Sequence, residues 1–146
     1  MQNFAYHLII FCSVTCFTMR ATASPLLDGL SHSILETPYS AVLMPLNYTQ
    51  QESSDRHESI VIVEAKVITP IRGALSNTLS FRAILEAGDS LGVLNKPILV
   101  SLCRQGDQFY FAGVGSAFAP TLEVIKYAQG VAKKIDRQQL DYQFCH

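Results

Sequence analysis

The sequence predicts an α+β fold, in which a mainly antiparallel sheet of about four to five strands is crossed by one C-terminal helix. Two runs with apolar residues at every second position, 60–71 and 78–86, are joined by a short turn and predict a first hairpin. A second pair of runs, 97–103 and 108–112, follows. Apolar residues then recur at helical spacing over 120–138. The same order of elements also fits a small five-stranded barrel.

The first 23 residues have the pattern of a secretory signal peptide. An apolar run of ten residues, 8–17, is followed by Ala21-Thr22-Ala23, the small-x-small pattern of a signal peptidase site. The run is shorter than the about 20 apolar residues that a transmembrane helix needs. We therefore expect cleavage after Ala23, export to a periplasm or to the exterior, and no stable membrane anchor afterwards. An uncleaved anchor is the alternative.

The mature chain divides into two predicted parts. Residues 24–58 contain two short apolar pieces separated by Pro38 and Pro45, then a polar run. We expect an irregular, extended arm or an edge strand, followed by a loop. Residues 59–146 are expected to form the compact domain.

The outward face of the first hairpin mixes charges with isoleucines, which a merely solvated face would not normally hold. We predict a protein-interaction surface at five residues on it, namely Ile60, Ile62, Ile68, Ile84 and Arg82. Two structural explanations compete with this prediction. The charges could pair across the strands, as Glu64 with Arg82 or Lys66 with Glu86, depending on register. The N-terminal arm could also cover the face.

Four cysteines are present, and two of them lie inside the predicted signal. The remaining pair, Cys103 and Cys145, would be oxidised in an exported chain, so we predict a disulfide that fastens the C-terminal tail to a strand. The alternative is a reactive thiol at Cys103, next to Arg104.

The glycine-rich stretch 112–119 lies between a predicted strand and the predicted helix, as a phosphate-binding loop would. Phe118 stands where a dinucleotide fingerprint needs a third small residue, and too little chain follows for a doubly wound sheet. We therefore interpret Gly113 and Gly115 as a turn that lets the chain leave the sheet. Ser116 does not lie in the Gly-x-Ser-x-Gly pattern of a hydrolase elbow.

Charge and histidine content point away from several functions. Without residues 1–23 the chain has ten Lys and Arg against twelve Asp and Glu, a formal charge of minus two, which argues against nucleic acid. The densest basic group, Lys133, Lys134 and Arg137, fits the C-terminal end of a helix. The mature chain's histidines are not spaced like metal ligands: His32, His57 and His146. We expect no metal, no cofactor and no catalytic residue.

These observations favour an exported, small, non-enzymatic binding or accessory module, an inhibitor or a subunit that docks on a larger envelope or extracellular assembly through a protein partner. The alternative is a small secreted hydrolase or ligand-binding protein that uses the glycine turn, residues 113–116. Asn47-Tyr48-Thr49 matches the glycosylation sequon, which applies only to a eukaryotic secreted chain.

Overall fold

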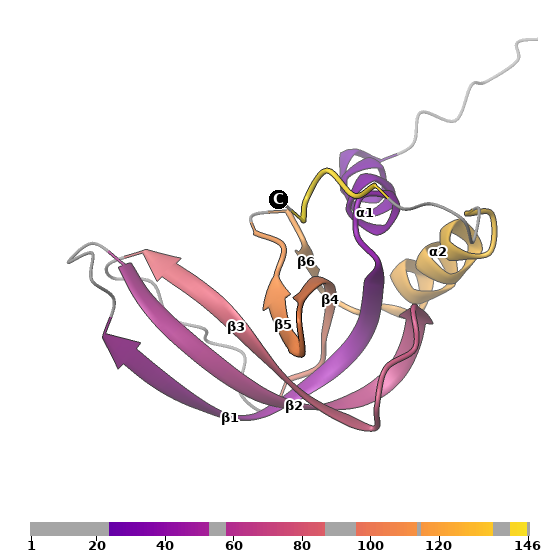
Figure 1. Ribbon diagram of the computed structural model, residues 1–146. Coiled ribbons are helices and arrows are strands. Elements are labelled where there is room, and N and C mark those ends of the chain that lie inside the picture. Colours follow the sequence, from indigo (N-terminus) through magenta and orange to yellow (C-terminus); the bar gives the residue numbers. More distant parts are fainter. Residues whose placement is uncertain (1–23, 53–57, 87–95, 114, 136–140, 146) are drawn as a thin grey trace, which may run out of the picture.

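A computed structural model of the chain describes residues 24–52, 58–86, 96–113, 115–135 and 141–145. Two helices and six strands follow one another along it (Figure 1). In chain order they are α1 (Pro25–Leu35), β1 (Tyr39–Glu52), β2 (Glu58–Arg72), β3 (Thr78–Glu86), β4 (Ile98–Gln105), β5 (Gln108–Phe111), β6 (Ala117–Phe118) and α2 (Leu122–Ala132).

Five strands form a closed, mixed barrel in the order β1-β2-β3-β5-β4, with β4 pairing back onto β1. The neighbours are antiparallel except β3 and β5, which run parallel over two residues each. The short strand β6 adds to β4. The predicted α+β class, the two hairpins and the C-terminal helix are thus confirmed, and the strands form the barrel that the sequence allowed.

The two longest strands curve beneath the rest of the molecule (Figure 1). The register between β1 and β2 shifts three times, the last time between Pro45 and Asn47. Such shifts increase the local twist and let a long sheet bend. Pro45, which the sequence suggested would confine its segment to an edge, lies inside β1 at this irregularity, where a missing N–H does not break the ladder.

Apolar side chains form two cores on opposite sides of the barrel wall. The barrel interior holds one cluster of buried residues: Ala41, Leu43, Val61, Val63, Ala65, Phe81, Ala83, Val100 and Leu102. Strand alternation turns Val42 and Leu99 the other way, and both helices pack on them in a second cluster that also contains Leu30, Ile34, Phe118, Val124 and Ala128. The helix layer therefore covers the outside of β1 and β4.

Residues 24–58 are not the irregular arm that we expected. They contain helix α1 and strand β1, and β1 pairs with both β2 and β4, so the folded unit begins at α1. A proline in the first turn of α1 and Asp28 close to its positive end favour a helix start. The boundary at residue 59 was wrong because the prolines of this segment occupy sites that strands and helix starts tolerate.

Helix α2 is shorter than the predicted 120–138. It is capped by the Thr121 hydroxyl, which accepts a hydrogen bond from the Val124 backbone N–H at 3.2 Å, and it ends at Ala132. Gly130 does not mark a close approach to the sheet, since an added Cβ would meet no atom within 4 Å. The predicted signal peptide lies outside the described residues. Within the described ranges no helix is both long and apolar enough to cross a bilayer.

Candidate functional site

The predicted interaction surface lies on the outside of the barrel, on the face that β2 and β3 turn away from the interior; we call it the β2–β3 outer face. The register places Ile60 opposite Ile84, and Ile62 opposite Arg82. Ile84 is 54% exposed, whereas Ile60, Ile62 and Arg82 are half-buried. Four of the five predicted residues are therefore adjacent on two strands, and none of the isoleucines belongs to either core.

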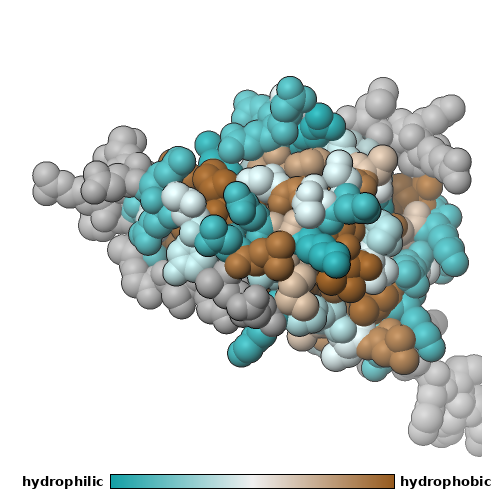
Figure 2. All heavy atoms as spheres, turned by 90° about the horizontal axis from the view of Figure 1, so that it is seen from below, coloured by the Kyte–Doolittle hydropathy of each residue, from teal (hydrophilic) through white to brown (hydrophobic). Residues whose placement is uncertain are grey.

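Ile68 stands apart from this group. It lies further along β2, beyond Lys66, the last residue of β2 that pairs with β3. Its side chain is 48% exposed. Figure 2 views the molecule from the side of β1, β2 and β3 and shows apolar residues distributed among polar ones, without one continuous apolar patch. Ile68 is thus a separate exposed residue of the same face.

The two predicted charge pairs are wrong. Glu64 lies opposite Ser80, and Lys66 lies opposite Thr78. Glu86 instead faces Glu58, so two exposed carboxylates stand opposite one another at the end of the ladder. The sequence could not fix this register because the hairpin connection, residues 73–77, allows more than one alignment. An ion pair does join Arg104 to Asp107, at 3.1 Å, but it lies on another hairpin.

The described part of the N-terminal segment, residues 24–52, does not cover the β2–β3 outer face. Helix α1 lies beside α2, on the far side of the sheet from this face, and β1 takes its place beside β2 as a strand (Figure 1). The described residues 24–52 therefore leave the isoleucines of β2 and β3 at the surface.

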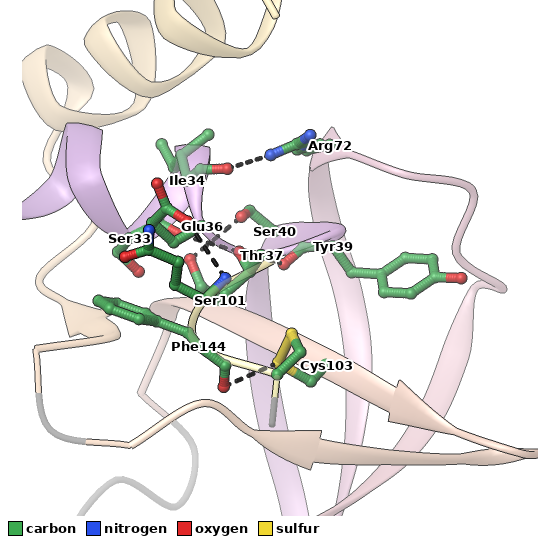
Figure 3. Close-up of a disulfide and its surroundings, with 12 residues drawn as sticks. Ser33, Ile34, Glu36, Thr37, Tyr39, Ser40, Arg72, Ser101, Cys103 and Phe144 are labelled. Carbon is green, nitrogen blue, oxygen red and sulfur yellow. Dashed lines mark hydrogen bonds between the residues drawn. A yellow bond between two sulfur atoms is a disulfide. The ribbon is translucent and has the colours of Figure 1, made fainter. Parts of the chain in front are cut away.

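The second predicted feature, the disulfide, joins Cys103 of β4 to Cys145, with Cα atoms 5.4 Å apart. Cys103 is bonded in this structure, which favours the predicted disulfide over the alternative of a reactive thiol. Figure 3 shows the tail beside the start of β1. The Gln143 backbone N–H donates to the Glu36 carboxylate at 3.2 Å, and the Phe144 N–H donates to the Glu36 carbonyl oxygen at 3.3 Å. The tail is thus fixed to the end of α1 as well as to β4.

Arginine 72 links the same end of α1 to the barrel, and the sequence analysis did not identify this role. Its guanidinium donates to the carbonyl oxygens of Ile34 and Leu35 and lies over the Tyr142 ring, 5.2 Å from the centroid. Burial lowers the pKa of this guanidinium, and nearby Tyr142 and Glu36 oppose that shift. These contacts satisfy helix-terminal carbonyls, which is a structural function.

A cavity of about 670 Å³ lies next to Arg72. Its wall contains Lys133 and the C-terminal turn of α2, Pro70 and Ile71 of β2, and Tyr142. Among the described residues the charged side chains in that wall are Arg72 and Lys133. Arg72 binds the carbonyls of α1, and Lys133 lies at the negative end of the α2 dipole. These two charges therefore have partners within the fold, and they define no ligand class.

The glycine turn does not form a phosphate cradle. Gly113 and Gly115 have φ of 105° and 85°, as the turn interpretation requires, but they connect β5 to β6. Helix α2 begins only after β6, with its own cap at Thr121. Ser116 is fully buried and its carbonyl oxygen accepts the Ser101 N–H at 2.9 Å, so its backbone extends the sheet. The turn returns the chain to β4, where β6 pairs with Leu99 and Val100 next to the segment that pairs with β5.

The described ranges contain no cluster of three or more His, Cys, Asp or Glu side chains that could hold a metal ion. His32, one of the three histidines considered from the sequence, packs edge-on against Phe144 with the ring centroids 5.0 Å apart. His57 and His146 lie outside the described residues.

The fold defines a class in structural terms, a small disulfide-linked barrel with two helices on one side. Comparisons with protein-family models, curated proteins and solved structures find no match to this chain.

Proposed function

We propose that this chain is an exported, non-enzymatic protein-binding module, an inhibitor or a subunit of a larger assembly, which docks through the β2–β3 outer face. The face offers apolar contacts from isoleucine side chains and one guanidinium, Arg82. These groups bind a protein surface through burial and charge, and they perform no acid–base or nucleophilic chemistry.

The observation that carries the proposal is the cross-strand pair of Ile60 and Ile84 on the outside of the barrel. An isoleucine that packs in neither core and remains 54% exposed gains nothing from its own fold over that exposed half. Covering it would contribute about 1 kcal/mol at the usual value for a buried isoleucine. Ile60 and Ile62 lie next to it and are half-buried, so a partner that covers all three side chains would gain about 2 kcal/mol.

One further point supports the proposal. A disulfide in a small chain is typical of exported proteins, because thiols stay reduced in the cytosol.

The experiment that tests the proposal is capture of a partner from an extract of the source cells or their medium. The bait is the chain from residue 24, oxidised and tagged at its N-terminus, and proteins that it retains are identified by mass spectrometry. The test variant is Ile84→Asp. The matched control is Leu122→Asp, which places the same charge on a leucine that is 68% exposed on the helix layer.

We expect a protein that is captured by the wild type and by Leu122→Asp, and lost with Ile84→Asp. Thermal unfolding of all three baits checks that the variants are folded. Equal capture by all three would remove the β2–β3 outer face as the docking site.

A further inference from the structure

We propose that a partner of the β2–β3 outer face is a second copy of this chain, stacked face to face about a two-fold axis. The inference rests on the proposed function, because it assigns a partner to the same surface. It is argued from the order of side chains along the face, which the register of β2 and β3 fixes.

Three successive cross-strand pairs of β2 and β3 face outward, and each pair forms one row of the face. The first pairs Glu58 with Glu86, the second pairs Ile60 with Ile84, and the third pairs Ile62 with Arg82. Neighbouring rows are two residues apart, about 7 Å along the strand. The apolar row is therefore flanked on one side by two carboxylates and on the other by a guanidinium.

This order is self-complementary. A two-fold axis that lies between the copies, perpendicular to the strands and over the middle row, reverses the order of the rows in the second copy. The isoleucines of the middle row then meet their own counterparts. Arg82 of each copy comes to lie over Glu86 of the other, and Ile62 over Glu58. Two equivalent charge pairs on β3 therefore flank the apolar centre, as an isologous interface requires.

The carboxylates of Glu58 and Glu86 favour binding of a cation that a second chain supplies. Glu58 and Glu86 are exposed and directly opposite, an arrangement that destabilises a sheet. Within the described residues neither takes part in an ion pair. A guanidinium from a second copy would offset this repulsion, and the isoleucine row next to it would exclude water from the contact.

The size of the face predicts a weak dimer. Three rows on two strands cover an area well below the about 800 Å² per partner of a stable interface. We therefore expect a dissociation constant between about 1 µM and 1 mM, and association that depends on protein concentration.

Charge reversal tests the pairing directly, with the oxidised chain from residue 24 and sedimentation equilibrium over that concentration range. Arg82→Glu places two carboxylates together across the axis, and Glu86→Arg places two guanidinium groups together. Each single reversal is expected to weaken dimerisation at least about tenfold. The double variant restores opposite charges and is expected to return to within about threefold of the wild type.

The Glu86→Arg variant also controls for folding. Its new cation faces Glu58 across the ladder, so the monomer is expected to unfold at a higher temperature while the dimer is lost. A loss of dimerisation with a raised melting temperature cannot come from misfolding.

Two results would overturn the inference: a wild type that stays monomeric over the whole range, or a dimer that the single reversals leave unchanged. Either result would reject the dimer without rejecting the proposed function. If Ile84→Asp still loses a captured protein of another sequence, the face remains a docking site and only the second copy is rejected.

Discussion

Removal of the Cys103–Cys145 disulfide is predicted to lower the free energy of unfolding by about 4 kcal/mol. The bridge joins residues 42 positions apart, and closing a loop of that length in the unfolded chain costs about 13 cal/mol/K of entropy. For a chain of this size the loss corresponds to a fall in melting temperature of about 15 °C. The hydrogen bonds between the tail and Glu36 increase this loss of stability only if they break when the disulfide is removed.

The assay is urea unfolding of the oxidised chain, of the reduced chain, and of the Cys103→Ser/Cys145→Ser double variant. The free energy of unfolding comes from linear extrapolation, and the slope reports whether the native state stays compact. The double variant is the control for the reductant, since reducing agent should leave its transition unchanged. We expect the reduced wild type and the double variant to have the same lowered stability.

If removing the disulfide lowers the free energy of unfolding by less than about 1 kcal/mol, the loop-entropy estimate is wrong. Such a result would mean that the tail is held to α1 and β4 as well without the bridge, and that the loop of about 40 residues is already ordered in the unfolded ensemble.

Three local predictions follow from the backbone and the caps. Gly73→Ala should destabilise the fold by about 2 kcal/mol or more, because Gly73 has φ of 75° and a Cβ there would lie 2.4 Å from the Tyr39 ring; an unchanged melting temperature would contradict it. Gly130→Ala should stabilise α2 by about 1 kcal/mol, since the site is open, and a loss of stability would show an unseen contact. Thr121→Ala should cost about 1 kcal/mol through loss of the cap on Val124, with Thr121→Ser as the control that keeps the hydroxyl.

The sequence predicted the elements whose signal is periodic. The alternation over β2 and β3 identified the hairpin and its two faces, and the helical spacing of Val124 and Ala128 with their neighbours identified α2. The disulfide followed from counting cysteines once the predicted signal was set aside. These features depend on local pattern and need no knowledge of which strands become neighbours.

What the sequence did not predict depends on contacts between distant segments. In strand β1, Pro45 separates two short apolar stretches. Only the pairing of this segment with β2 and β4 makes it one strand of 14 residues. The parallel pairing of Phe81 with Phe109, which closes the barrel, has no local signal at all. The register that places Glu58 opposite Glu86 likewise emerges only from the assembled sheet.

The capping role of Arg72 was missed for a related reason. Its partners, the carbonyls of Ile34 and Leu35, lie in a helix that the sequence analysis had assigned to an irregular arm. A residue 38 positions away in sequence cannot be paired with a helix end before that helix is recognised.

Isoleucine methyl NMR tests whether the β2–β3 outer face binds a partner, with spectra recorded as the protein is concentrated and again as a captured partner is added. We expect the methyl signals of Ile60, Ile62 and Ile84 to shift. The signals of Ile34 in the helix layer and Ile98 beside the barrel interior should stay in place. Shifts confined to the helix layer, with the signals of β2 and β3 unchanged, would contradict it.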